Sequence, residues 1–318
     1  MKRSLTSSIG PQIELFLEFK RSQGFKYGTA EYYLSNLDDY WAANGYDNNF
    51  SKEHINGWFI RGEHENPDTH NCRISYLREF GRFLQSQGYR DAYIIPTGLS
   101  KRGPKYMPYL LSEDKIEKFF ETCDRITPQK EDSGKPLVLP AYFRFLYCCG
   151  VRTGEARLLK TDDVNLVQGY ADIINTKGGK CRRLFLSNEL IKLLDEFDSK
   201  ISIYYPSRTY FFPCNDNVPY SSQAISRAFN KIWSDAGLPA ECKPKPRAYD
   251  FRHHFAFANI NRWVENGINI NGMLPYLMNY MGHSSIKSTF YYIHLIPEFF
   301  GVYSEKTKAL ESMIPEVG

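Results

Sequence analysis

Two arginines in the second half of the chain stand where their guanidiniums can be held in fixed positions. Arg152 opens a helix just after Gly150, and Arg252 lies near the beginning of a long helix. Breaking a phosphodiester without a metal ion requires stabilisation of a pentacoordinate phosphorane, which two fixed guanidiniums provide through bidentate contacts. Arg152 and Arg252 are therefore candidate phosphate ligands. The alternative for Arg152 is a surface ion pair with Glu155, because residues three positions apart meet on a helix.

The last sixth of the chain adds a histidine and a tyrosine. Apolar residues at helical spacing predict a short amphipathic helix that ends at Gly282, so that His283 projects just past a helix end. Tyr292 follows nine residues later, directly after Tyr291. A tyrosine nucleophile conserves the bond energy as a phosphotyrosyl ester, which permits religation without ATP. Tyr291 is the competing nucleophile, and a place in the core is the alternative for both tyrosines.

A hairpin with two lysines is predicted between the two arginines. Residues 170–175 and 182–186 have the pattern of strands, and Lys177 and Lys180 flank the two glycines of the turn between them. The leaving oxygen of a cleaved phosphodiester needs a proton, which a lysine near the phosphate can donate. The alternative for both lysines is a solubilising charge at a strand edge.

No metal ion and no cofactor is expected. The adjacent His253 and His254 point to different faces of a helix, and no carboxylate or cysteine stands at ligand spacing from them. The seven cysteines are odd in number and scattered without a CxxC motif. Cys148 and Cys149 lie in a strongly apolar stretch, so we expect buried, reduced thiols rather than disulfides or zinc ligands.

Length and charge permit two domains and a nucleic-acid partner. The chain has 318 residues, a formal net charge of +4 and a sequence pI near 8.5, which allows binding to DNA without requiring it. No apolar run approaches the length that spans a bilayer. We therefore expect a soluble, cytoplasmic protein with no membrane partner.

The first hundred residues have the periodicity of a compact helical unit. Helices are predicted at 11–23, at 29–43 with Thr29 as the cap, after Ser51, and from Asp68 or Thr69 to Gly88. The unit is not basic overall, so a DNA contact would need a local stripe of cations, and a solvated charged face is the alternative. The candidates for such a stripe are Lys20, Arg21, Lys26, Arg73 and Arg82.

A linker and a second domain follow. Prolines, glycines and three cations over residues 96–106 predict an extended linker. Lys101, Arg102 and Lys105 suit a segment that crosses a phosphate backbone, and a solubilising hinge is the alternative. Ser112 then caps a helix with an acidic first turn. The predicted fold is mostly α with a small β-sheet, an α+β class.

Five motifs occur in one order along the chain. They are GVRTGE at 150–155, TKGGK at 176–180, YDFRH at 249–253, GHSS at 282–285 and YIH at 292–294. In this order the chain resembles the tyrosine recombinase (phage integrase) family, and the likeness covers nearly all of it. The resemblance implies a helical core-binding (SAM-like) DNA-binding domain at 1–95, a linker at 96–106 and a catalytic domain at 107–318.

The resemblance also implies a role for each motif residue. Tyr292 would form a 3′-phosphotyrosyl intermediate, Lys177 would be the general acid, and His283 would hydrogen-bond a nonbridging oxygen. Lys180 is then a DNA contact, and the supporting residues are Glu155 and His294. Arg152 and Arg252 keep the phosphate-binding role that their chemistry indicates.

One position departs from the family pattern. Three residues before Arg252 the family usually has histidine, and this chain has Tyr249. An unperturbed tyrosine, with a pKa of about 10, accepts a proton near neutrality less readily than histidine, with a pKa of about 6.5. Tyr249 then hydrogen-bonds the phosphate, and the general base is left open between Tyr249, water and another side chain.

The implied partner is double-stranded DNA with paired recombination half-sites. The resemblance implies a homotetramer on DNA, in which the segment after Tyr292 docks on a neighbouring subunit. Accessory proteins are left open. The predicted role is integration, excision or transposition of a mobile element. The alternatives are a dimer-resolution recombinase, a type IB topoisomerase-like enzyme and a DNA-binding protein without catalysis.

Overall fold

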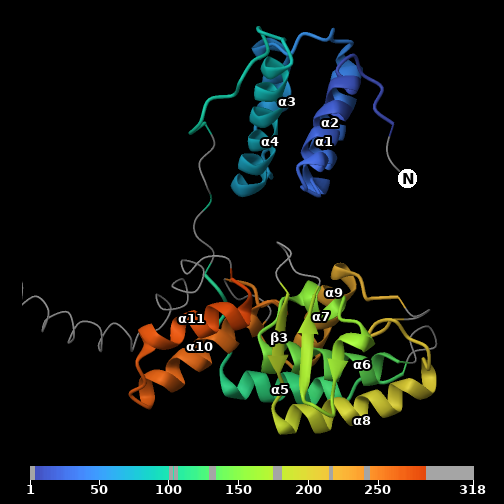
Figure 1. Cartoon of the computed structure of the whole chain (residues 1–318), viewed down its shortest axis with the longest axis vertical. Coiled ribbons are helices and arrows are strands. Elements are labelled where there is room, and N and C mark those ends of the chain that lie inside the picture. The colour runs from blue at the N-terminus through green and yellow to red at the C-terminus, as the bar shows by residue number, and fades with distance from the viewer. Residues whose placement is uncertain are drawn as a thin grey trace, which may run out of the picture. The chain divides into compact units, whose positions relative to one another are not determined.

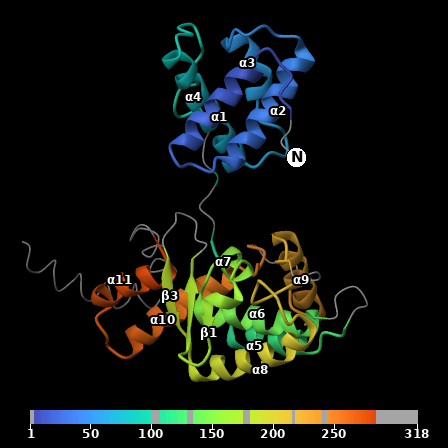
Figure 2. The same ribbon diagram turned by 45° about the vertical axis from the view of Figure 1, so that its right-hand side comes forward.

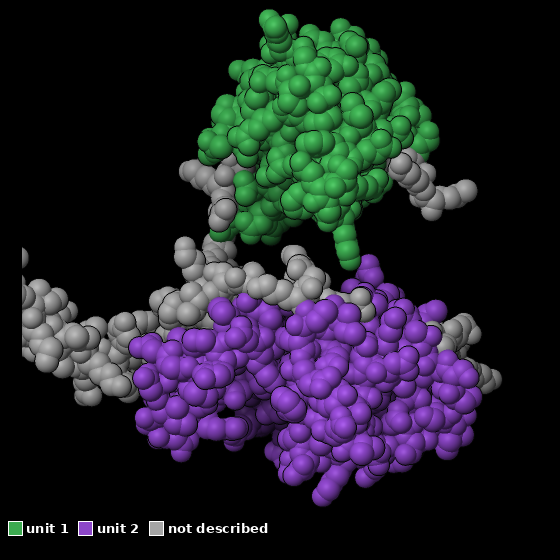
Figure 3. All heavy atoms as spheres, viewed as in Figure 1, with its two compact units in different colours: residues 1–105 green, residues 106–318 purple. Residues whose placement is uncertain are grey.

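The structure is a computed structural model that describes residues 4–99, 103, 107–128, 134–174, 181–214, 218–239 and 244–283. The chain divides into two compact units, Met1–Lys105 and Tyr106–Gly318 (Figure 3). The described parts are mostly helical with one small antiparallel sheet, which confirms the predicted fold class. Among these residues no helix is both long and apolar enough to cross a membrane.

The first unit contains the four predicted helices with shifted starts. Ser51 caps the third helix by accepting a hydrogen bond from the N–H of His54 at 3.2 Å, as expected. The second helix begins at Gly28, so Thr29 lies inside it and is not its cap. The fourth begins one residue before the predicted Asp68, because Asn66 caps it and a proline fits its first turn. The helices are α1 Gly10–Ser22, α2 Gly28–Asn44, α3 Lys52–Phe59 and α4 Pro67–Ser86.

Three of the five candidate DNA-binding cations of this unit are engaged in ion pairs inside it. Lys20 pairs with Glu79 at 2.9 Å, Arg21 with Glu31 at 2.5 Å, and Arg73 with Glu65 at 2.8 Å. The guanidinium of Arg73 is also buried and lies over the ring of Trp58. The charge of the proposed stripe is therefore largely balanced within the unit, and Lys26 and Arg82 are its exposed members.

In the second unit, helices pack around a three-stranded antiparallel sheet (Figures 1 and 2). β2 and β3 form the predicted hairpin, with Ile173 opposite Arg182 and Ala171 opposite Leu184. β1 is only two residues long and has no sequence signal of its own. The strands are β1 Val164–Asn165, β2 Tyr170–Ile173 and β3 Arg182–Phe185. The helices are α5 Glu113–Asp124, α6 Lys135–Cys149, α7 Thr153–Arg157, α8 Asn188–Tyr204, α9 Ser222–Asp235, α10 Asp250–Glu265 and α11 Ile270–Met281.

An aromatic core holds α10 in place. The ring of Phe251, near the start of α10, lies 5.3 Å from Phe119 on α5 and 5.8 Å from Phe229 on α9, measured between ring centroids. Fully burying a phenylalanine side chain stabilises a fold by about 1.5–3 kcal/mol, so this cluster anchors the helix. Arg252 is the next residue along the chain, and its position follows from that of Phe251.

A second apolar cluster joins α10 to α11, which lie side by side (Figures 1 and 2). The rings of Phe255 and Tyr280 stack at 5.5 Å between centroids. α11 ends at Gly282, which has a φ of +65°, so the predicted glycine stop is confirmed. Cys149, at the end of α6, is buried as expected, whereas its neighbour Cys148 is exposed, because consecutive residues of a helix point in different directions.

Candidate active site

Arg152 is the N-cap residue of α7, as the sequence predicts, and both terminal nitrogens of its guanidinium donate hydrogen bonds. Nη1 donates to Oε1 of Glu155 at 2.6 Å, and Nη2 donates to the carbonyl oxygen of Gly282 at 2.9 Å. The main-chain N–H of Arg152 donates to Oε2 of Glu155 at 3.0 Å. Since the side chain of Glu155 is only 2 % exposed, this is a buried ion pair and the surface alternative is wrong.

A further arginine, Arg182, shares the same carboxylate. It is the first residue of β3, and its Nη2 donates to Oε2 of Glu155 at 2.7 Å. Burial alone would raise the pKa of Glu155, but the hydrogen bonds and charge of Arg182, together with Arg152, hold that pKa below its ordinary value. Glu155 is therefore a charged carboxylate between two guanidiniums.

Arg252 is buried and bridges two elements. Nη1 donates to the carbonyl oxygen of Gly150 at 2.8 Å, and Nη2 donates to the carbonyl oxygen of Met281 at 2.6 Å. The residue is 1 % exposed. Arg252 thus connects the end of α6 to the end of α11, and it lies close to the elements that hold Arg152.

Three consecutive carbonyl groups at the end of α11 each accept a hydrogen bond from a different arginine. Arg182 binds the carbonyl oxygen of Tyr280 at 2.7 Å, Arg252 that of Met281, and Arg152 that of Gly282. The last carbonyls of a helix have no partners within it and carry partial negative charge, so cations stabilise them. Three arginines therefore fix the end of α11, from which the next residue projects.

That next residue is His283, which faces the arginine cluster. Burial of the imidazole, with the charges of Arg252, Arg152 and Arg182, lowers the pKa of His283 to about 4. The ring is therefore neutral at physiological pH and can donate one hydrogen bond without adding charge. The structure brings together four residues that the sequence singles out, namely Arg152, Glu155, Arg252 and His283.

Tyr249 is half-buried at the N-cap of α10, three residues before Arg252. Its ring packs edge-on against His253, with 5.1 Å between centroids. Burial and the charges of Arg247 and Arg252 lower the pKa of His253 to about 4. A neutral histidine thus lies beside the tyrosine that replaces the family's usual one.

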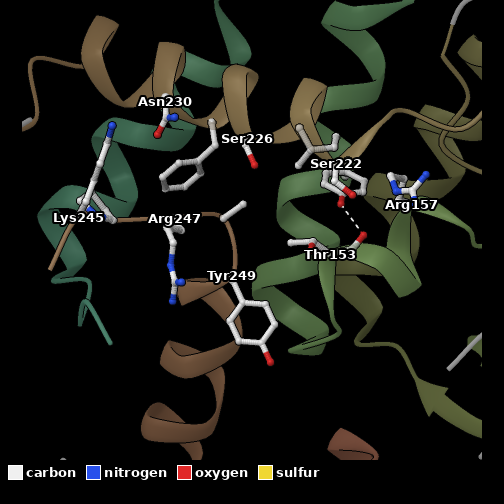
Figure 4. A pocket seen from close by; sticks show the side chains of 13 residues that line it. Thr153, Arg157, Ser222, Ser226, Asn230, Lys245, Arg247 and Tyr249 are labelled. Carbon is white, nitrogen blue, oxygen red and sulfur yellow. Dashed lines mark hydrogen bonds between the residues drawn. The ribbon is translucent and has the colours of Figure 1, made fainter. Parts of the chain in front are cut away.

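A pocket of about 340 Å³ opens beside Tyr249. Lys245 and Arg247, on the segment before α10, line one end of it, and Arg157 on α7 lies at the other end beside Ser222 (Figure 4). Between these ends α9 contributes hydroxyl and amide groups, from Ser222, Ser226 and Asn230 (Figure 4). Cations combined with neutral donors and acceptors suit the phosphates and polar groups of a nucleic acid.

Several predicted site residues lie outside the described residues, and their roles stay predictions. They are Lys177 and Lys180 of the hairpin turn, Tyr292 and His294 of the last motif, and Lys101, Arg102 and Lys105 of the linker. Within the described part of the chain, no three His, Cys, Asp or Glu side chains gather in a way that could hold a metal ion.

Sequence reasoning missed Arg182, although the strand pattern carried a signal for it. Side chains alternate between the two faces of a strand, so Arg182 lies on the same face as the buried Leu184. Arg183 points the other way and is exposed. A charged residue on the inward face of a strand needs a buried partner, and here that partner is Glu155.

Comparison with known proteins identifies the class to which this fold and site belong. The model of the phage integrase family matches residues 110–298, more than half of the chain, so the chain belongs to that family of tyrosine recombinases. The tyrosine recombinase XerC of Lactobacillus leichmannii is 27% identical over 236 residues, which cover 71% of this chain and 72% of that protein.

Solved structures share the fold. The XerH site-specific recombinase bound to its palindromic difH substrate superposes with a TM-score of 0.65 at 20% identity, over 87% of this chain and 78% of that chain. A lambda integrase tetramer bound to a Holliday junction gives 0.59 at 17% identity, over 89% and 76%. These likenesses agree with the family assignment from sequence.

Proposed function

We propose that the chain is a site-specific DNA recombinase that cuts and rejoins DNA through a covalent 3′-phosphotyrosyl intermediate. The observation that carries this proposal is the cluster of Arg152, Arg252 and His283 around the end of α11. It combines two guanidiniums with a neutral imidazole, which is a set of donors suited to a phosphoryl group. Family membership supports the same reaction.

Two residues of the sequence motifs, a nucleophile and a general acid, carry out the bond exchange that we propose. The phenol of Tyr292 gives its proton to a base, which is left open between Tyr249, water and another side chain. Its oxygen then attacks phosphorus, and the bond from phosphorus to the 5′-oxygen breaks. Lys177 donates a proton to that oxygen as it leaves. Religation reverses these steps, so no ATP is consumed. Arg152 and Arg252 balance the charge of the phosphorane, and His283 donates to a nonbridging oxygen.

Double-stranded DNA with paired half-sites is the proposed substrate. The pocket lined by Arg157, Lys245 and Arg247 supports a DNA contact beside the reaction centre. Lys180 and the linker cations extend this contact in the proposal, and the first unit is the proposed core-binding domain. The DNA complex of XerH is consistent with such a substrate.

A homotetramer is the proposed assembly, with the segment after Tyr292 exchanged between subunits. The lambda integrase structure is a tetramer on a Holliday junction, which supports a tetrameric assembly by likeness of fold. Movement of a mobile element is the proposed role, with dimer resolution as the second candidate. We place the reaction in the cytoplasm.

The test is covalent capture of DNA by the full-length chain. Duplexes from a random-sequence library that stay attached after denaturation in SDS identify a site, and a nick placed next to the cleaved phosphate then traps the complex. We expect Tyr292→Phe to abolish trapping while binding to the duplex stays within about twofold. Tyr291→Phe is the matched control and should trap normally.

The attachment point and the metal requirement complete the test. Mass spectrometry of the trapped peptide should place the nucleotide on Tyr292. A nucleotide on Tyr291 would contradict the assignment of the nucleophile. Trapping should also survive excess EDTA, because the arginines supply the positive charge. Activity that disappears with EDTA and returns with magnesium would contradict the proposed mechanism.

A further inference from the structure

Arg182 lies at the beginning of β3 and reaches two other elements with one guanidinium. Nε donates to the carbonyl oxygen of Tyr280 at 2.7 Å. Nη1 and Nη2 donate to Oε1 and Oε2 of Glu155 at 3.2 and 2.7 Å. The side chain is 9 % exposed. One buried side chain therefore joins the hairpin strand, α7 and the end of α11.

The contact with Glu155 passes directly to Arg152. Both carboxylate oxygens of Glu155 are shared, because Oε1 also accepts from Nη1 of Arg152 and Oε2 from its main-chain N–H. A buried carboxylate that loses one of its two cations is less strongly held in its charged form. Arg182 thus supports the charge that orients the guanidinium of Arg152.

The contact with α11 is tight as well as polar. A Cβ atom added to Gly282 would lie 2.9 Å from Nη1 of Arg182 and 3.1 Å from its Cζ. The guanidinium therefore packs directly on the glycine that ends the helix, while its Nε holds the carbonyl of Tyr280. The residue that follows this glycine is His283.

We propose that Arg182 is a positioning residue for strand cleavage. It fixes Glu155, and through it Arg152, and it fixes the helix end from which His283 projects. The inference rests on the proposed function, because it requires that Arg152 and His283 bind the scissile phosphate. Arg182 itself acts through these residues, since its Nε, Nη1 and Nη2 all donate to protein atoms.

The neighbouring Arg183 provides a matched control. It lies on the opposite face of the same strand, pairs with Asp172 at 2.8 Å, and covers the ring of Tyr170 at 3.7 Å from the centroid. Its side chain is 49% exposed. Replacing either arginine removes an ion pair from β3. Of the hydrogen bonds described for the two residues, only those of Arg182 reach Glu155 and α11.

The experiment measures the rate of covalent trapping and the affinity for DNA separately. Full-length Arg182→Lys and Arg182→Gln are compared with Arg183→Lys and Arg183→Gln on the nicked duplex recovered by covalent capture. Misplacement of a reacting group by about 1 Å can slow a reaction by about 10²-fold. We expect a loss of that order in single-turnover trapping for both Arg182 variants, with the Kd for the duplex changed by less than about twofold. Arg183 variants should stay within about twofold in both.

A double variant tests the path through the carboxylate. Groups that act as a unit are not additive when replaced together. Arg182→Gln combined with Glu155→Gln should therefore trap DNA no more slowly than the slower single variant. If Arg182→Gln does not fold, Arg182→Lys, which keeps a cation at this position, is used in the same comparison.

The outcomes separate this inference from the proposed function. If the unchanged chain traps no duplex, the proposed function fails. If the unchanged chain traps DNA and Arg182→Lys does so at the same rate, the positioning role alone is overturned. Additive losses in the double variant, or a parallel loss of trapping in Arg183→Lys, would also overturn it.

Discussion

The guanidinium of Arg252 donates to the carbonyl oxygen of Gly150 at 2.8 Å, although 102 residues separate them in the chain. Gly150 has a φ of +58°, and a Cβ atom there would lie 2.4 Å from the ring of Phe255, one turn further along α10. The glycine therefore lets the end of α6 approach α10 closely enough for this bond. Because Arg152 follows two residues later, the bond fixes the separation of the two arginines.

Arg252→Lys should destabilise the fold as well as stop cleavage. A lysine cannot bridge the carbonyls of Gly150 and Met281 together, so we expect the free energy of unfolding to fall by about 2–4 kcal/mol. Arg262→Lys, at an exposed position on the same helix, is the control and should change it by less than about 0.5 kcal/mol. Urea denaturation measures both. An unchanged midpoint for Arg252→Lys would show that the carbonyls do not depend on the guanidinium.

Gly282→Ala should impair cleavage beyond its cost in backbone strain. Gly282 and Gly267 both have a left-handed φ, +65° and +66°, so alanine at either should cost about 1 kcal/mol of stability. Only at Gly282 does the new methyl group meet Arg182, whereas nothing lies within 4 Å at Gly267. We expect trapping to fall on the order of tenfold or more for Gly282→Ala alone. Equal trapping rates in the two variants would contradict this.

Acid should destabilise the DNA-free protein through buried histidines, of which His253 and His283 have the largest shifts in pKa. His253 and His283 have folded-state pKa values of about 4, below the ordinary value of about 6.5. The unfolded chain therefore binds more protons between these values, so the stability they contribute is complete above about pH 6.5 and lost as the pH falls toward 4.

The measurement for this pH effect is the melting temperature at pH 7 and pH 4.5. It should be lower at pH 4.5, and His253→Gln should shrink the difference because a neutral amide binds no proton. Since carboxylates also titrate in this range, the comparison is with His64→Gln at an exposed position of the first unit. If the melting temperature falls between pH 7 and pH 4.5 by as much in His253→Gln as in His64→Gln, protonation of His253 does not explain the effect.

Tyr249→Phe separates the hydroxyl from the ring. The phenylalanine keeps the edge-on packing against His253, so stability should change by less than about 0.5 kcal/mol. If the hydroxyl hydrogen-bonds the phosphate, trapping should slow by about 10- to 100-fold. Tyr276→Phe, on an exposed face of α11, should have no effect. Full activity of Tyr249→Phe would leave water or another side chain as the base.

The two lysines of the hairpin turn can be told apart by a sulfur substitution. A 5′-thiolate leaves without protonation, so it rescues the loss of the true general acid. We expect Lys177→Ala to be slow on normal DNA and largely restored on a 5′-thio duplex. Lys180→Ala should show a weaker, salt-sensitive binding defect that sulfur does not repair. The reverse pattern would assign the acid to Lys180.

Local patterns predicted the elements of the site but not its connections. The glycine at 282 indicated the end of α11, and the glycine at 150 indicated that Arg152 begins a helix. Both are backbone signals that a few neighbouring residues determine. The hairpin followed from alternation and turn residues in the same way.

The burial of Glu155 had no such local signal. The spacing of Arg152 and Glu155 predicts a surface ion pair equally well. Burial results from contacts that are distant in the chain: Arg182, 27 residues away, binds the carboxylate, and the end of α11 binds Arg152. The convergence of three arginines on Tyr280, Met281 and Gly282 likewise depends on tertiary packing. Periodicity within a segment does not contain that information.

Covalent geometry limits how far Tyr292 can lie from the fixed end of α11. Tyr292 lies nine residues beyond His283, and a fully extended chain spans at most about 3.6 Å per residue, so their Cα atoms can be no more than about 32 Å apart. In any assembly in which Tyr292 serves a phosphate held by another subunit, this limit together with the length of the tyrosine side chain bounds the distance from His283 to that phosphate. Glycines inserted between His283 and Tyr292 would raise this limit and widen the set of geometries in which one subunit can reach the next.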